Sequence, residues 1–227
     1  MPVKILGVLP LAGSGSRSGL YFHKSLAPIM VSGVPVPVVS FSIKRLRKVS
    51  SEILAILYAE SEYHFPVAEL DLKAIEKPER GELPSSIAAG GEEAKKIGFS
   101  HVAVSLPDTI WFPENAFEIL VENLDETTDG ILGLFYGDGR MLDEVASDEG
   151  KVINVHLHAK QTDQHFIVWG WGILILSVEA AAKLDDLSPL ANQLSNLKLD
   201  CIKFENSEFL DIGTPERYFD VFGRFNS

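Results

Sequence analysis

Cysteines and long apolar runs are scarce in this sequence. Cys201 is the single cysteine among 227 residues, so no internal disulfide can form, and we expect an intracellular, cytoplasmic protein. The longest apolar run, residues 166–176 (FIVWGWGILIL), is much shorter than the roughly 18 residues that a membrane helix requires. The apolar N-terminal run leads into Gly-Ser-Gly-Ser-Arg without a cleavage site and is interpreted as a first strand rather than a signal peptide. We therefore expect no membrane partner.

Acidic side chains are missing from the first 50 residues, which contain seven Lys or Arg and no Asp or Glu. Residues 51–227 carry the other 13 basic residues and all 32 acidic ones, and the whole chain has a net charge of −12. This charge argues against a nucleic-acid partner. The cationic first segment instead predicts a phosphate site that uses Arg17 and Lys24. The remaining basic run, residues 44–48 (KRLRK), is interpreted as the solvated end of a helix.

Apolar runs that are typical of buried strands alternate with helical patterns. The expected strands are residues 4–11, 52–59, 100–106, 130–136, 151–157, 166–176 and 199–204. The expected helices are residues 36–49, 115–126, 177–184 and 215–225. This alternation predicts an α/β fold in one domain, with a mainly parallel sheet covered by helices on both sides. Ligands of such sheets bind at the carboxyl ends of the strands, which directs attention to residues 11–13, 107–108 and 211–213.

A glycine-rich loop, residues 13–19 (GSGSRSG), follows the first expected strand. A Walker-type phosphate loop would need two glycines five positions apart and a following Lys-Ser or Lys-Thr, which this loop lacks. A dinucleotide-binding fingerprint would need glycine where Ser18 stands, and an acidic residue about 20 positions later. What remains is a flexible backbone that can present N–H groups to an anion, next to the positive charges of Arg17 and Lys24.

Three blocks of the sequence resemble the motifs of one enzyme family, the nucleotidyltransferases that activate sugar phosphates. Residues 9–29 (LPLAGSGSRSGLYFHKSLAPI) resemble the family signature L-A-x-G-x-G-[ST]-R, followed by a lysine and L-x-P-[IVL]. Residues 209–221 (FLDIGTPERYFDV) resemble its closing motif W-x-D-I-G-T-P-E-x-Y. Residues 102–113 (VAVSLPDTIWFP) resemble its central strand, with Pro107 in place of a glycine. The blocks occur in the family's order. The chain is therefore similar to nucleotide-sugar pyrophosphorylases such as glucose-1-phosphate thymidylyl- and uridylyltransferases.

The resemblance implies a fold and a reaction. The implied fold is a single Rossmann-like α/β domain over residues 1–227, with a mixed, mainly parallel sheet flanked by helices. The implied reaction transfers a nucleoside monophosphate from a nucleoside triphosphate to a sugar 1-phosphate and releases pyrophosphate, with Mg²⁺ as cofactor. A homo-oligomer is compatible with the sequence but is not specified by it.

The resemblance also implies roles for individual residues. Arg17 and Lys24 take the catalytic positions, with Arg17 on the leaving phosphates and Lys24 on the α-phosphate. Asp108 and Asp211 are the carboxylates offered to Mg²⁺, which needs only one or two of them. Glu76 stands where relatives have a glutamine that reads the base. The residues expected to bind the nucleotide are Leu11, Ala12, Gly13, Ser14, Gly15, Ser16, Glu76 and Gly81.

One family motif is altered in residues 150–163 (GKVINVHLHAKQTD). Relatives have Glu-Lys-Pro here, and the lysine holds the sugar phosphate. This chain has His158 at that register and Lys160 two residues later, which makes Lys160 the candidate for the sugar phosphate. The change leaves open a non-catalytic homologue that binds nucleotide or nucleotide-sugar. The short segment between Arg17 and Lys24 leaves open a cytidylyltransferase that acts on a polyol or other alcohol phosphate.

Overall fold

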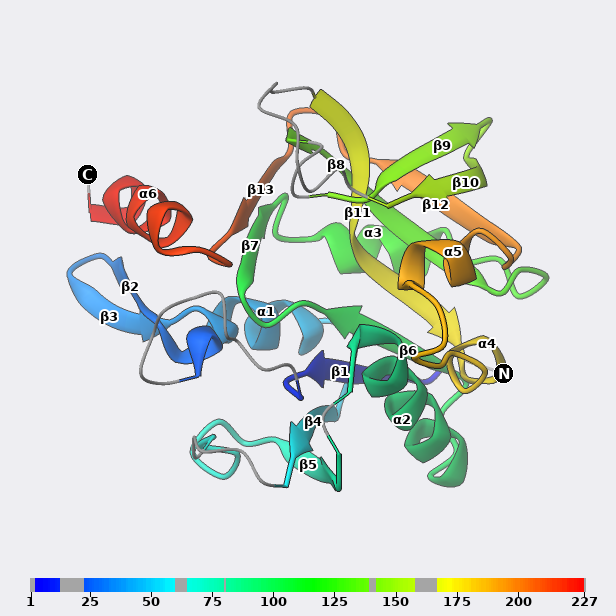
Figure 1. The fold of residues 1–227 in the computed structure, drawn as a ribbon, viewed down its shortest axis with the longest axis horizontal. Coiled ribbons are helices and arrows are strands. Elements are labelled where there is room, and N and C mark those ends of the chain that lie inside the picture. The colour runs from blue at the N-terminus through cyan, green and yellow to red at the C-terminus, as the bar shows by residue number, and fades with distance from the viewer. Residues whose placement is uncertain are drawn as a thin grey trace.

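A computed structural model describes residues 3–12, 23–59, 65–79, 81–138, 142–157 and 167–226. A large twisted sheet runs through the molecule, with β5 at one edge and β9 at the other (Figure 1). Within the described residues this sheet has nine strands in the order β5-β4-β1-β6-β11-β8-β12-β10-β9. Their bounds are β1 Ile5–Pro10, β4 Ile53–Tyr58, β5 Lys73–Lys77, β6 His101–Ser105, β8 Gly130–Asp138, β9 Glu144–Asp148, β10 Lys151–His156, β11 Ile167–Ser177 and β12 Leu199–Lys203.

The sheet is mixed, as the sequence predicts. Strands β5, β4, β1 and β6 pair in parallel, and so do β8 and β12. Strand β11 is antiparallel to both β6 and β8, and β10 is antiparallel to both β12 and β9. Seven of the nine described strands therefore point the same way, and only β10 and β11 are reversed. The expected mainly parallel direction is confirmed.

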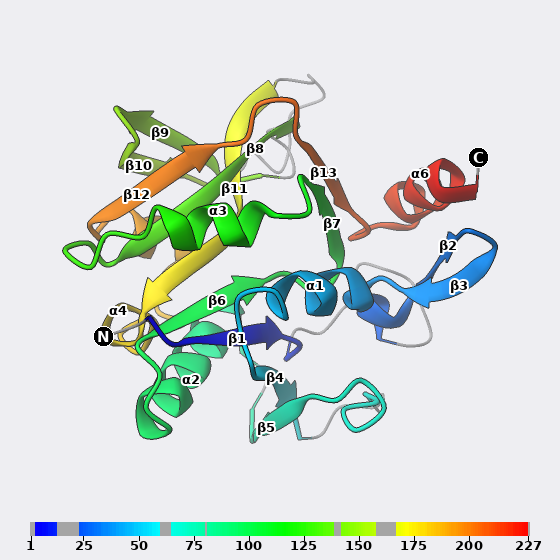
Figure 2. The ribbon, with the colours of Figure 1, turned by 180° about the vertical axis from the view of Figure 1, so that it is seen from behind.

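Helices cover both faces of the sheet because each face is lined with apolar side chains. On one face, α1 (Val39–Leu46) and α3 (Ala116–Glu122) pack on the apolar residues of β1, β4 and β11. On the other, α2 (Leu83–Lys96), α4 (Val178–Ala181) and α5 (Leu190–Leu194) do the same. Figure 2, seen from behind, brings α1 and α3 to the front, whereas α2 and α5 face the viewer in Figure 1. No described helix is long and apolar enough to cross a membrane.

A smaller apolar cluster lies at one end of the molecule, where α6 (Pro215–Asn226) lies beside the hairpin of β2 (Pro28–Val31) and β3 (Val34–Pro37). A separate two-stranded sheet, β7 (Thr109–Phe112) with β13 (Glu208–Asp211), leads into this cluster. The turn between β6 and β7 therefore lies next to the turn between β13 and α6. This neighbourhood positions two of the predicted site residues.

Helix α2 was not expected from the sequence, because the pair Gly90-Gly91 lowers its helix propensity, although Pro84 lies in the first turn, where proline is tolerated. The packing explains the glycines. A Cβ atom on Gly90 would lie 2.7 Å from Cγ2 of Val8, and one on Gly91 would lie 2.8 Å from Cβ of Ala181. The glycines thus let α2 approach β1 and α4 closely, and this burial offsets the poor local propensity. The expected helix over residues 177–184 is shorter than predicted, because α4 ends at Ala181.

The interpretation of residues 44–48 as a solvated helix end is wrong for Arg45. This side chain is 1% exposed, and its guanidinium carbon lies 4.5 Å from the ring centroid of Trp111. Neither terminal guanidinium nitrogen has a hydrogen-bond partner among the described residues. Burial lowers the Arg45 pKa to about 10 from its ordinary 12.5. The aromatic rings of Phe41 and Phe112 also face the cation, which explains how a charge is accommodated there.

Candidate active site

A cavity of about 580 Å³ opens at the carboxyl ends of β1 and β6. This is where a parallel sheet of this type binds its ligands. Its walls come from segments that are far apart in the sequence: the end of β1, the turn after β6, the start of α2, β11, and the turn from β13 into α6. The lining residues are Pro10, Leu11, His23, Lys24, Gly81, Glu82, Leu83, Ser86, Leu106, Pro107, Asp108, Thr109, Leu142, Asp143, Trp171, Phe209, Asp211, Gly213, Thr214 and Arg217.

Lys24 and Asp108 form an ion pair in this cavity, between Nζ of the lysine and Oδ2 of the aspartate. Lys24 begins the short 3₁₀ helix η1 (Lys24–Leu26), and Asp108 lies in the turn between β6 and β7. Their side chains are 23% and 12% exposed, so the pair is partly shielded from solvent. Screening by water is weaker there than at the surface, which strengthens the interaction of either charge with a ligand.

Asp211 lies beside this pair, because β13 places it opposite Thr109, the residue after Asp108. Its Oδ1 atom accepts a hydrogen bond from the Gly213 N–H at 2.6 Å, and its Oδ2 atom is 2.6 Å from Nη1 of Arg217. Burial raises the pKa of Asp211, and the charge of Asp108 adds to this rise. Arg217 and the Gly213 N–H act in the opposite direction. Asp108, in the turn before β7, and Asp211, at the end of β13, therefore lie close together.

His23 fixes the position of the segment that carries Lys24. Its Nε2 atom is 3.1 Å from the carbonyl oxygen of Leu11, and its Nδ1 atom is 2.6 Å from Oγ of Ser25. Because a carbonyl oxygen can only accept, Nε2 carries the proton and Nδ1 accepts from the hydroxyl. Burial lowers the pKa of His23, which favours this neutral form. The residue joins the end of β1 to η1, a role that the sequence did not reveal beyond its position before Lys24.

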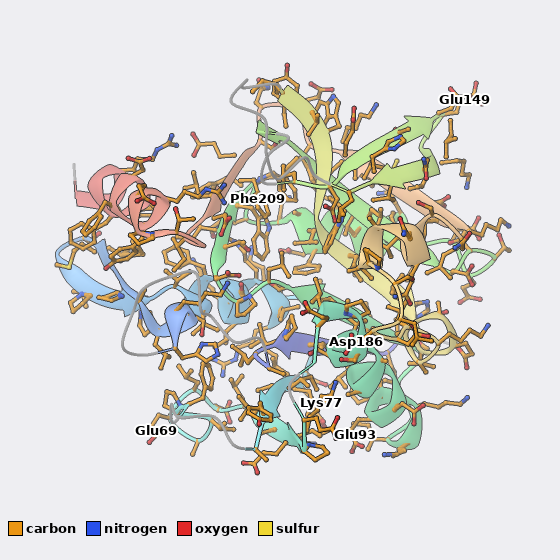
Figure 3. The ribbon with its side chains drawn as sticks, viewed as in Figure 1. Glu69, Lys77, Glu93, Glu149, Asp186 and Phe209 are labelled. Carbon is orange, nitrogen blue, oxygen red and sulfur yellow. The ribbon has the colours of Figure 1, made fainter. Side chains whose placement is uncertain are left out.

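The start of α2 forms the opposite wall of the cavity, and a distant loop fixes it. Asp186 accepts hydrogen bonds from the backbone N–H groups of Glu82 at 3.1 Å and Ser85 at 3.0 Å. Nζ of Lys77 donates to Oγ of Ser85 at 2.5 Å. Figure 3 labels Asp186 and Lys77 near this end of α2 and Phe209 away from them on β13. Asp186 is 101 residues from Ser85 in the sequence, so sequence reasoning missed it.

The remaining predicted site residues lie in different places. Leu11 lines the cavity and Ala12 is buried next to it, while Gly81 lines the wall at the start of α2. Glu76 is exposed on the edge strand β5 and does not line the cavity. Several predicted residues fall outside the described part of the chain, namely Gly13, Ser14, Gly15, Ser16, Arg17, His158 and Lys160.

The carboxylates of Asp108 and Asp211 suit the coordination preferences of Mg²⁺. This ion binds oxygen ligands, keeps several waters and needs only one or two protein carboxylates. The mutual repulsion that helps to raise the Asp211 pKa is the kind of repulsion that a divalent cation relieves. No group of three or more His, Cys, Asp or Glu that could hold a metal occurs among the described residues. A fully protein-enclosed metal site is therefore not built from this part of the chain, whereas a two-carboxylate site fits.

The sequence matches one protein family over most of its length. Residues 7–196 match the model of the MobA-like NTP transferase domain. The chain belongs to this family. Membership in the MobA-like NTP transferases confirms the resemblance to nucleotidyltransferases drawn from the motifs. No curated protein matches the sequence significantly.

Solved structures of nucleotidyltransferases share the fold of this MobA-like chain at low sequence identity. A putative glucose-1-phosphate thymidylyltransferase from Bacillus anthracis has 15% identity and a TM-score of 0.72, with 98% of this chain and 96% of that chain covered. The inositol-1-phosphate CTP transferase from T. maritima has 13% identity and a TM-score of 0.70, with 100% and 98% covered. UDP-glucose pyrophosphorylase from Acinetobacter baumannii has 12% identity and a TM-score of 0.73, with 99% and 93% covered. At these identities the likeness establishes the mixed α/β fold.

Proposed function

We propose that this MobA-like NTP transferase moves a nucleoside monophosphate from a nucleoside triphosphate to a sugar 1-phosphate and releases pyrophosphate. The observation that carries the proposal is the cluster of Lys24, Asp108, Asp211 and Arg217 in one cavity at the carboxyl end of β1. The cluster contains two cationic side chains and two carboxylates. Such groups can bind and position two phosphorylated substrates, whereas they are not suited to oxidation or hydride transfer.

The reaction needs positioning and charge stabilisation more than proton transfer. The acceptor phosphate is already ionised and attacks the α-phosphorus in line, so no general base is required. Negative charge builds on the non-bridging oxygens and on the leaving pyrophosphate. Lys24, held by Asp108 and by the fixed η1 segment, would place its ammonium group against the α-phosphate. Neutral His23 keeps this segment in place without adding a competing charge.

Mg²⁺ fits this proposal as the cofactor. Asp108 and Asp211 would hold the ion, which when bound supplies positive charge to the phosphate oxygens. The two carboxylates would otherwise repel both substrates. We therefore propose a dependence of activity on a divalent cation.

The site supports an active enzyme over a non-catalytic homologue. The altered Glu-Lys-Pro motif raised that alternative, but Lys24, Asp108 and Asp211 all converge on one cavity. The sugar 1-phosphate acceptor is supported by the D-I-G-T-P segment that leads into α6. The T. maritima neighbour acts on an inositol phosphate according to its name, so an inositol 1-phosphate belongs in the test.

A substrate panel tests this proposal. The protein would be incubated with Mg²⁺, each common nucleoside triphosphate and a set of acceptors, and pyrophosphate release would be measured. The acceptors would include glucose 1-phosphate, mannose 1-phosphate, inositol 1-phosphate and a polyol phosphate. We expect release with one triphosphate and a sugar 1-phosphate. Release only with the polyol or inositol phosphate would overturn the acceptor class, and release with no pair would contradict the enzymatic proposal for these substrates.

A further inference from the structure

Arg217 occupies a position in the cavity that the expected substrate roles leave unassigned. It is the third residue of α6, and in the closing motif it stands at the variable position between Glu and Tyr. Its side chain is 32% exposed and lines the cavity, while Nη1 lies 2.6 Å from Oδ2 of Asp211. The ion pair thus fixes a cation at the wall formed by β13 and α6.

Few of the described residues that line this cavity are cationic. Among its described lining residues, Lys24 and Arg217 are the only lysine or arginine. Lys24 pairs with Asp108 and Arg217 pairs with Asp211, so the four charges balance. Two phosphorylated substrates bring several further negative charges. If Lys24 serves the triphosphate, Arg217 is the described cation that remains for the acceptor.

Part of the backbone at the start of α6 is already engaged, which reduces the donors that it can offer to an acceptor phosphate. A helix N-terminus favours an anion through its exposed N–H groups. Here the Gly213 N–H donates to Asp211, the Arg217 N–H donates to Oγ1 of Thr214 at 3.4 Å, and Pro215 has no N–H. The guanidinium group is the cationic donor at this wall. It carries five N–H donors in one plane, and the Asp211 contact leaves others to face a phosphate.

We propose that Arg217 binds the phosphate of the acceptor substrate and that Asp211 holds it in position to do so. This inference rests on the proposed function, and it assigns to Arg217 the preference of the site for a phosphorylated acceptor. Phe209 and Trp171 also line the cavity and contribute apolar surface to it. The predicted Lys160 lies outside the described residues, so Arg217 is proposed from the geometry independently of it.

The test compares Arg217→Gln with Arg224→Gln. Arg224 lies on the same helix, and its Nη1 atom is 3.9 Å from Oε1 of Glu208, but it does not line the cavity. A charge-assisted hydrogen bond is worth about 1.5–3 kcal/mol, which corresponds to a roughly 10- to 150-fold change in affinity. We expect Arg217→Gln to raise the KM for the acceptor by about that factor and to leave the KM for the triphosphate within about threefold. Arg217→Lys should recover part of the loss, and Arg224→Gln should change neither constant.

A second measurement separates this inference from the proposed function. Glucose 1-phosphate and inorganic phosphate would be titrated into each variant by calorimetry, which requires no turnover. Weaker binding of both probes to Arg217→Gln than to Arg224→Gln supports the inference, even if the substrate panel releases no pyrophosphate. Equal binding of both probes to the two variants would overturn it. So would an unchanged acceptor KM together with a lowered Tm, because that result shows Arg217 to be only the structural partner of Asp211.

Discussion

Removal of the Asp186 carboxylate should loosen one wall of the active-site cavity. Asp186→Ala deletes the acceptor of two hydrogen bonds, from the N–H groups of Glu82 at 3.1 Å and Ser85 at 3.0 Å. These groups are among the donors at the start of α2 that have no partner within the helix. The loss of a helix-capping side chain costs about 0.5–2 kcal/mol. Because Asp186 is exposed, we expect about 1 kcal/mol, or about 2–4 °C in Tm for a chain of this size.

The effect of this substitution should depend on pH in a defined direction. Burial by itself raises the pKa of Asp186, but the hydrogen bonds from Ser85 and Glu82 and the charge of Lys77 outweigh it, so the pKa lies below its ordinary 3.8. A carboxyl group with a lowered folded-state pKa stabilises the fold above its unfolded pKa and loses this contribution as the pH falls through the folded value. The stability difference between wild type and Asp186→Ala should therefore be constant from pH 7 to pH 5 and shrink below about pH 3.8.

Urea unfolding and nucleotide titration together check this prediction. Gly81, Glu82, Leu83 and Ser86 line the cavity, so a frayed α2 start should weaken triphosphate binding several-fold as well as lower the stability. Asp185→Ala is the matched control, because Oδ1 of Asp185 accepts a hydrogen bond from the Leu187 N–H within its own loop. If Asp186→Ala and Asp185→Ala had the same stability and the same affinity for triphosphate, the assignment of Asp186 as the cap of α2 would be refuted.

Four further substitutions test the roles of other residues. Arg45→Met should raise the free energy of unfolding by about 1–2 kcal/mol in urea denaturation. The lowered pKa of Arg45, about 10, corresponds to a burial cost of about 3 kcal/mol, whereas a desolvated cation–π contact contributes about 2 kcal/mol of stabilisation. A loss of stability in the variant would show that the aromatic contacts prevail. Lys24→Ala should lower turnover about a hundredfold at unchanged Tm, since it removes a transition-state contact of about 3 kcal/mol, and an unaltered rate of pyrophosphate release would disprove this role. Asp108→Asn and Asp211→Asn should each strongly reduce Mg²⁺-dependent activity. Calorimetry without metal should find that each variant binds nucleotide as tightly as the wild type or more tightly, because a repelling negative charge is gone. Full activity of the wild type in excess chelator would contradict this reasoning.

The sequence predicts the sheet well where one physical signal dominates. Strands such as β1 and β11 are continuous apolar runs because both of their faces are buried, and such runs are visible in a single sequence. The site is partly predictable for a related reason. Asp108 and Asp211 each follow or end a strand, and the pairing of β7 with β13 brings those strand ends together. The family motifs then predict that these two aspartates and Lys24 belong to one site.

The features that escaped prediction depend on contacts between distant segments. Gly90 and Gly91 argue locally against a helix, and only their proximity to Val8 and Ala181 explains α2. Arg45 belongs to a basic run that is typical of a solvated helix end, and its burial depends on Trp111 in β7. No local pattern records such tertiary contacts, so single-sequence reasoning cannot recover them.

The central claim is that the cavity around Lys24 and Asp108 transfers a nucleoside monophosphate to a phosphorylated sugar. The most direct measurement is ³¹P nuclear magnetic resonance of the wild-type protein with Mg²⁺, the best triphosphate from the panel and its sugar 1-phosphate. We predict that a nucleoside diphosphate sugar and pyrophosphate appear in equal amounts as both substrates disappear, and that Lys24→Ala suppresses both products. Persistence of both substrates, or conversion of the triphosphate to diphosphate and inorganic phosphate without a nucleotide-sugar, would contradict it.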